Sequence, residues 1–158
     1  MPCILVMCAV VVLTAGCQAS LIGKVIPPWP SGLHKGQGNC FNSAHACEAG
    51  LGVLNDQAVV PKVIYAWIRS AQQVSELPTY RVTDSIRFPQ LHGTQLWECG
   101  VCRSTSAPDD TIMALVEPAK TEWLRASEWA YRVDKGSGKF VPLDPHQVDC
   151  YNTAREAD

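Results

Sequence analysis

Cys99 and Cys102 are the residues whose types and spacing most directly suggest chemistry, because Cys-x-x-Cys pairs occur in thiol–disulfide oxidoreductases. In such enzymes the pair opens a helix, whose N-terminus lowers the thiol pKa. Here the surrounding residues, from Trp97 to Arg103, are strand-like. Cα atoms three residues apart on a strand are separated by about 10 Å, whereas a disulfide tolerates at most about 7 Å. We therefore expect separate partners or a turn at Gly100, which favours a structural role over a redox one.

Thiolate and imidazole groups at other positions also raise the question of a zinc site. The candidate ligands are Cys40, His45, Cys47, Cys99 and Cys102. One Cys-x-x-Cys without a second pair at matched spacing is weak evidence for zinc, and export to an oxidising compartment favours disulfides. We therefore predict no metal site and no cofactor.

The remaining polar residues form no recognisable catalytic set. The sequence contains no Gly-x-Ser-x-Gly, His-Glu-x-x-His or phosphate-loop motif. Asp109 and Asp110 could bind a cation but are typical of a solvated turn. Nothing selects a pair among the other candidates, which are His34, His45, His92, His146, Glu98, Glu117, Glu122 and Glu128. We predict no catalytic residue, and whether the chain is an enzyme stays open.

Tryptophan is frequent in this chain. It is enriched at binding hot spots, so some tryptophans are candidates for a surface groove, although core packing is their more common use. The five residues are Trp29, Trp67, Trp97, Trp123 and Trp129.

The N-terminus carries a short apolar run that ends in small residues and a cysteine. The run from Cys3 to Leu13 is shorter than the roughly 20 apolar residues that span a bilayer and has the length of a signal peptide's apolar region. The segment Leu13-Thr14-Ala15-Gly16-Cys17 resembles the lipobox of bacterial lipoproteins. The alternative is an ordinary secretory signal that is cleaved after Ala19.

The lipoprotein resemblance implies a location. Residues 1–16 would be a removed signal peptide, and Cys17 would be lipidated and become the mature N-terminus. Gln18 in the next position implies placement in the outer membrane, with the membrane as one partner. Residues 17–39 would then be a flexible, lipid-anchored tether, because prolines and glycines are frequent there. Residues 40–158 would form a single globular domain.

Cysteine parity predicts the disulfide pattern. If Cys17 is acylated, the mature chain keeps five further cysteines, which allow two disulfides and one unpaired thiol. Cys40 and Cys47 could pair locally, provided that Cys40 lies outside a helix. Cys150 could pair with Cys99 or with Cys102.

The composition bounds the class of partner. The chain has 158 residues, with 13 basic and 15 acidic residues and a net charge of −2. The charges are interspersed, without the basic cluster that phosphate backbones require. Nucleic acid is therefore not an expected partner.

The apolar pattern predicts one main helix followed by strands. Residues 40–55 look like a short helix that Gly50 and Gly52 weaken. Residues 61–75 place apolar side chains on one helical face, although their β-rich composition also allows a buried strand. Alternation predicts strands at the following ranges, of which the fourth could instead be a helix from Pro118: 80–88, 94–103, 111–117, 122–134 and 139–143.

This order of elements predicts an α+β fold: a main helix and then an antiparallel β-meander, held by disulfides. The order resembles the cystatin-like and NTF2-like folds, by analogy and not by motif.

The leading functional hypothesis is a non-enzymatic lipoprotein that binds another protein at the cell envelope. It would be an accessory component of a conjugation or secretion assembly, or an immunity or inhibitor protein. One alternative is an envelope thiol–disulfide oxidoreductase that uses Cys99 and Cys102. Another is a module that binds a metal or a small ligand.

Overall fold

The computed structural model describes residues 20–41, 47–71 and 78–154. The lipobox-like segment that ends at Cys17 and the candidate ligand His45 lie outside the described residues. The described part of the chain contains strands and one 3-10 turn, η1 (Pro145–Gln147). The strands are β1 (Val25–Ile26), β2 (His34–Cys40), β3 (Ala49–Asn55), β4 (Pro61–Arg69), β5 (Tyr80–Arg87), β6 (Leu96–Cys99), β7 (Cys102–Arg103), β8 (Ile112–Val116), β9 (Trp123–Asp134), β10 (Lys139–Pro142) and β11 (Asp149–Tyr151).

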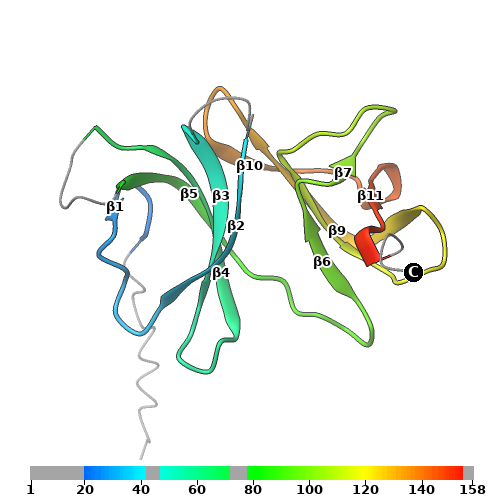
Figure 1. Cartoon of the computed structure of the whole chain (residues 1–158), viewed down its shortest axis with the longest axis horizontal. Coiled ribbons are helices and arrows are strands. Elements are labelled where there is room, and N and C mark those ends of the chain that lie inside the picture. The colour runs from blue at the N-terminus through cyan, green and yellow to red at the C-terminus, as the bar shows by residue number, and fades with distance from the viewer. Residues whose placement is uncertain (1–19, 42–46, 72–77, 155–158) are drawn as a thin grey trace, which may run out of the picture.

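The strands form two antiparallel sheets, which lie to the left and to the right in Figure 1. The first sheet has the order β1-β5-β4-β3-β2, and the second has the order β6-β8-β9-β11-β7, with β10 also paired to β9. The second sheet curls so far that Cys102 on β7 forms a bridge with Asp109, just before β8. The predicted α+β fold is therefore wrong: the described residues are nearly all β.

The predicted main helix at residues 61–75 is instead β4 over its first nine residues. Ile64 and Ala66 belong to the core shared with the second sheet, and Tyr65 and Trp67 belong to the core on the opposite face. A strand buried on both faces has no polar alternation, so its continuous apolar run also satisfied the spacing of a helical face. The cystatin-like and NTF2-like analogies depended on that helix and are withdrawn.

The predicted weak helix at residues 40–55 is also wrong, because Ala49–Asn55 is strand β3. Gly50 and Gly52 do not end a helix; they lie opposite Trp67 and Tyr65 on β4. A Cβ atom at Gly50 would lie 2.6 Å from Cζ2 of Trp67, and one at Gly52 would lie 2.5 Å from Oη of Tyr65. The glycines therefore leave room for both aromatic rings across the sheet.

Two strands of the first sheet, β1 and β2, lie in the segment that was expected to be a flexible tether. Val25 and Ile26 pair with β5, and β2 pairs with β3. Leu21 and Ile26 are buried against Tyr65 and Trp67. The structure therefore extends the globular domain about twenty residues toward the N-terminus, beyond the predicted start at Cys40.

The later strands agree with the alternation of the sequence. Residues 80–87, 112–116 and 139–142 are β5, β8 and β10. Residues 123–134 are strand β9 rather than the alternative helix. The strand expected at 94–103 is divided into β6 and β7 by a turn at Gly100, which has a φ of +76°.

Hydrogen bonds near the edges of the two sheets connect one sheet to the other. On one side, Asp84 Oδ2 accepts a hydrogen bond from the Phe140 N–H at 3.0 Å, and Lys139 Nζ donates to the Thr83 carbonyl at 2.9 Å. On the other side, Asn39 Nδ2 donates to the Asp110 carbonyl at 3.2 Å. The last contact fixes the loop before β8, which forms one wall of the cleft described below.

Candidate functional site

Among the described residues the cysteines form two disulfides, Cys40–Cys47 and Cys102–Cys150, and Cys99 is unpaired. The prediction of disulfide bonds is therefore confirmed. Cys102 finds Cys150 because the register of β7 and β11 places these residues directly opposite each other. Cys99 and Cys102 are therefore not bonded to each other.

The environment of Cys99 does not favour redox chemistry. Burial, with a smaller contribution from the neighbouring Glu98 carboxylate, raises the pKa of the Cys99 thiol to about 11. Reactive cysteines have the opposite shift, because the thiolate is the nucleophile. Cys99 therefore remains protonated at neutral pH, which removes the nucleophilic form that thiol exchange requires.

The candidate zinc ligands that the structure describes do not form a metal site. Cys40, Cys47 and Cys102 are consumed by disulfides. Within residues 20–41, 47–71 and 78–154, no group of three or more His, Cys, Asp or Glu side chains is arranged to hold a metal ion. The same part of the chain has no helix long and apolar enough to cross a membrane.

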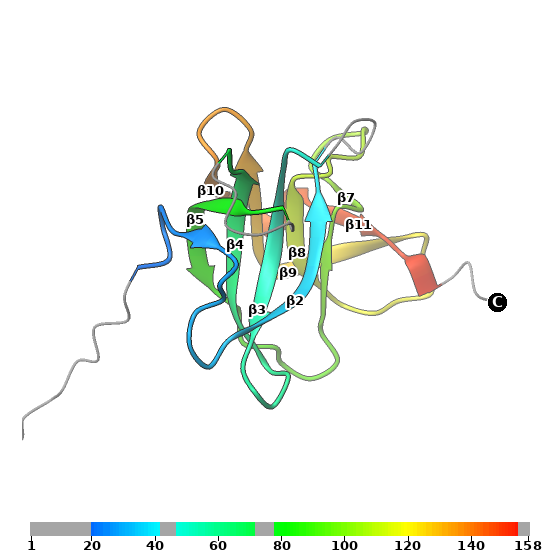
Figure 2. The same cartoon turned by 60° about the vertical axis from the view of Figure 1, so that its left-hand side comes forward.

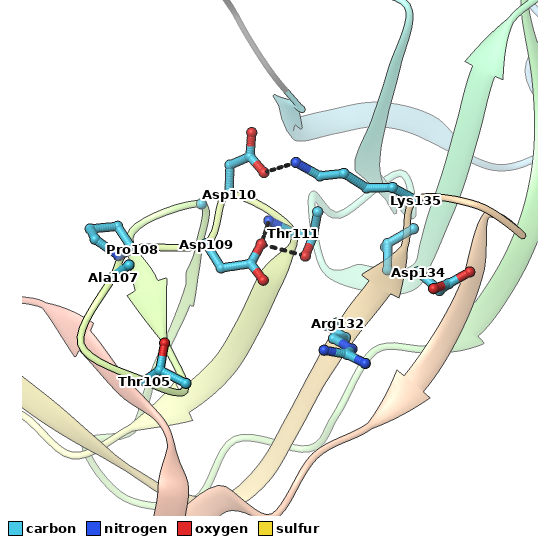
Figure 3. A pocket seen from close by; sticks show the side chains of 11 residues that line it. Thr105, Ala107, Pro108, Asp109, Asp110, Thr111, Arg132, Asp134 and Lys135 are labelled. Atoms are coloured by element: carbon cyan, nitrogen blue, oxygen red, sulfur yellow. Dashed lines mark hydrogen bonds and ion pairs between the residues drawn. The ribbon is translucent and has the colours of Figure 1, made fainter.

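An open cleft of about 690 Å³ lies between the loop from β7 to β8 and the hairpin of β9 and β10. Figure 3 shows the two walls, with Asp109 and Asp110 on the loop and Arg132, Asp134 and Lys135 on the hairpin. The cleft is the candidate functional site, because it brings together polar side chains from two segments about 25 residues apart in sequence.

Side-chain hydrogen bonds hold the loop wall. Asp109 Oδ1 accepts from the Thr111 N–H at 3.0 Å and from its hydroxyl at 2.6 Å. The Asp109 N–H donates to the Cys102 carbonyl at 2.8 Å, next to the disulfide with Cys150. Asp109 is thus a structural residue of the turn, and its carboxylate is already occupied by the backbone and hydroxyl of its own loop.

The hairpin wall is held in the same manner. Asp134 Oδ1 accepts from the Ser137 hydroxyl at 2.7 Å and from its N–H at 2.8 Å. These bonds lower the pKa of the Asp134 carboxyl, so the turn keeps its charged acceptor well into the acid range. Gly138, which has a φ of +67°, lies against Thr83 of β5 and ties the hairpin to the first sheet.

One ion pair crosses the cleft. Lys135 Nζ lies 2.9 Å from Asp110 Oδ1, and both side chains are partly exposed. Exposed pairs of this kind contribute about 0–1 kcal/mol, so a ligand with its own charges could replace the pair at little cost. The lining residues include three carboxylates and two cationic side chains but no cysteine or histidine. The cleft can therefore recognise a charged group.

Of the residues singled out in the sequence, only Asp109 and Asp110 lie in the cleft. Glu98 is half-buried on β6, and Glu128 accepts a hydrogen bond from Gln95 at 3.2 Å on β9. Arg132, Asp134 and Lys135 were missed. Strands were expected on both sides of this turn, at residues 122–134 and 139–143, but nothing in the sequence placed the turn opposite residue 110.

The tryptophans do not form a shared surface groove. Trp67 is buried, and Trp29, Trp97 and Trp129 pack against the cores of the sheets. Trp123 is the exception: the Arg103 guanidinium lies 3.6 Å from its ring centroid. Core packing therefore accounts for most of them.

Comparison with protein-family models, with curated proteins and with solved structures finds no match to this chain.

Proposed function

We propose that this protein is an exported, non-enzymatic binding protein that is anchored at the outer membrane through Cys17 and recognises a protein partner at the cell envelope. The observation that supports binding is the cleft: both of its walls are fastened by internal hydrogen bonds, and they present carboxylates and cations without a catalytic pair. Loops carried on a rigid β scaffold are a common location for recognition sites. The two disulfides suit export to an oxidising compartment.

Charge reversal in the cleft tests the partner. We would compare capture of envelope proteins by the tagged wild type with capture by Asp110→Lys, Lys135→Glu and the swapped double variant. If the partner recognises the charges of the individual side chains, all three variants should fail to capture it. If the ion pair only positions the two walls, the swapped pair restores binding. Glu122→Lys is the control, because Glu122 is exposed and does not line the cleft. Equal capture by every variant would remove the cleft from the proposal.

The anchor is tested separately. Cys17→Ser should abolish the acyl mass on the mature N-terminus and release the protein from the membrane fraction. An unchanged membrane fraction with this variant would contradict the lipid anchor but would leave the cleft experiment valid.

A small-ligand module is the second candidate, and the size of the cleft favours it. Ligand pockets commonly have volumes of about 300–1,000 Å³, and the cleft falls within that range. Native mass spectrometry of protein purified from its own envelope distinguishes the two proposals. A stoichiometric bound mass that Lys135→Glu abolishes, with no partner captured, would favour the small ligand.

A further inference from the structure

Five side chains from three strands share the outer face of the second sheet. Arg103 on β7 and Arg125 on β9 both lie opposite Asp149 on β11. Tyr151 on β11 lies opposite Trp123 on β9. Residues directly opposite on antiparallel strands, and residues two apart on one strand, point to the same side of a sheet. We name Arg103, Trp123, Arg125, Asp149 and Tyr151 the arginine–aromatic face.

The first sheet does not cover this face. The residues between its members, Cys102, Leu124 and Cys150, point the other way, into the core that the second sheet encloses. The core shared with the first sheet takes no residue from β7 or β11, and its nearest residues on β9 are Trp129 and Tyr131. Figures 1 and 2 show β7 and β11 at the right, away from β4 and β5. All five side chains accordingly keep some exposure to solvent.

Aromatic contacts hold the Arg103 side chain in place. Its guanidinium carbon lies 3.6 Å from the centroid of the Trp123 ring. The Trp123 ring in turn meets Tyr151 edge to face, with 5.5 Å between the ring centroids. A guanidinium that is already held in this way loses little conformational entropy when it binds a ligand.

The N–H donors of Arg103 are not used by the folded chain. Nη2 lies 3.7 Å from Asp149 Oδ2, which is close enough for an ion pair but too far for a hydrogen bond. A guanidinium has five N–H donors in a rigid fork, and none of those of Arg103 makes a hydrogen bond within the described residues.

The charges around the face are mixed. Arg125 lies beside Asp149 and is exposed, and the segment before β9 contains Glu117, Lys120 and Glu122. The net charge of the region therefore favours neither sign. Specificity depends instead on the unused donors of Arg103, whose geometry matches a carboxylate that accepts two N–H groups at once.

We propose that the arginine–aromatic face is a second docking surface, which binds an acidic side chain of a protein partner. The partner's carboxylate accepts from the fork of Arg103, and an adjoining apolar group packs beside Trp123 and Tyr151. Tryptophan, tyrosine and arginine are the residue types most enriched at binding hot spots. No member of the face lines the cleft, so this inference depends neither on the cleft nor on the lipid anchor.

A pair of matched peptides tests the surface on the full chain with both disulfides intact. The probe is acetyl-Tyr-Glu-Tyr-amide, and its neutral control is acetyl-Tyr-Gln-Tyr-amide. Nuclear magnetic resonance follows the indole N–H of Trp123 and the Nε–H of Arg103. The acidic peptide should shift both signals saturably, with a Kd of about 1 mM, and the neutral peptide should bind at least about tenfold more weakly. Equal shifts with the two peptides, or none with either, would overturn the inference.

Arginine variants test the fork. Arg103→Gln should weaken binding at least about tenfold, and Arg103→Lys about fivefold, because an ammonium cannot donate as a planar fork. Arg125→Gln leaves the contact with Trp123 in place and should weaken binding about threefold, because Asp149 then loses a neighbouring cation. Arg87→Gln, at an exposed position on β5, is the control and should change nothing. Equal losses in the control would attribute binding to net charge and would overturn the inference.

Two further measurements identify what occupies the face. Inorganic phosphate that displaces the acidic peptide at concentrations below the Kd of the peptide would show a phosphate site and overturn the protein partner. Binding of the peptide only to a chain truncated after Ala154 would show that the protein's own C-terminal residues occupy the face, which would also overturn the proposal. Weak competition by phosphate and equal affinities of the two chains are the expected results.

Discussion

Val59 has a φ of +63° and a side chain that is 73% exposed, in the turn between β3 and β4. Asp56 holds this turn: its Oδ1 accepts from the N–H groups of Ala58 and Val60, each at 2.9 Å. A residue with a Cβ atom in the left-handed region costs about 1–2 kcal/mol, and β-branching makes the conformation rarer still. The strain is thus maintained by the hydrogen bonds of Asp56.

Val59→Asn should stabilise the protein by about 1 kcal/mol, because asparagine tolerates the left-handed region. The melting temperature would rise by roughly 2–4 °C. Val60→Asn is the control: Val60 is also exposed, and its φ is not positive. Equal shifts in the two variants would show that the gain comes from removing an exposed valine and not from relief of the backbone.

Cys99 should make stability depend on pH in the alkaline range. Burial raises the pKa of the Cys99 thiol in the folded protein to about 11, above its ordinary value of 9.0. Between these values the unfolded chain releases a proton that the folded chain keeps, so stability falls as the pH rises. The expected loss between pH 8 and pH 10 is about 1 kcal/mol.

Urea unfolding of the wild type and of Cys99→Ala at both pH values measures this effect. The variant should lose less stability than the wild type over the same interval. Parallel losses would show that Cys99 is accessible to water in the folded protein.

The expectation of two bridges and one thiol came from counting the five cysteines that follow Cys17, because five residues cannot all pair. The count was not sufficient to choose the partner of Cys150. That choice depends on the register between β7 and β11, which is set by pairing across 48 residues of sequence and is not encoded next to either cysteine.

At the scale of elements, the stretch before β2 is a structural part of the first sheet. Ile26 is 1% exposed, and Ile22, four residues earlier, is 46% exposed. Ile26→Ala should therefore destabilise the domain by about 2–5 kcal/mol. Ile22→Ala should change stability by less than about 0.5 kcal/mol. Thermal unfolding of the two variants checks this contrast. A small loss of stability with Ile26→Ala would support the hypothesis of a flexible tether.

The elements that were mispredicted share a physical cause. Proline and glycine suggested a flexible segment at residues 20–39, but Leu21 and Ile26 supply the apolar contacts that keep it in place. In β4, burial on both faces removed the alternation that distinguishes a strand. Strands β5 and β9 were predicted because polar side chains alternate with apolar ones along them.

At the scale of the whole molecule, the two disulfides should contribute different amounts to the free energy of unfolding. Loop closure predicts that Cys102–Cys150, across 48 residues, contributes about 4 kcal/mol, and that Cys40–Cys47, across seven, contributes about 2.4 kcal/mol. Double serine variants of each pair, compared by urea unfolding, measure the difference. A larger loss on removing Cys40–Cys47 would show that contacts, and not loop length, decide the order.

The cleft could not have been predicted from the sequence as a site. Asp110 lies in the loop from β7 to β8 and Lys135 lies in the turn of the β9–β10 hairpin, and the fold brings Lys135 Nζ to 2.9 Å from Asp110 Oδ1. The turn at Asp109 and Asp110 was recognisable from the sequence, but its position beside Lys135 follows from long-range strand pairing.

Both walls of the cleft lie inside the covalent ring closed by Cys102–Cys150. A peptide bond cut in either wall leaves the two new ends in one molecule, since the bridge still links the fragments. The cleft would thus tolerate nicking by a protease, because one cleavage in either wall would not separate the two walls. Severing the fragments would require a reductant as well as a protease.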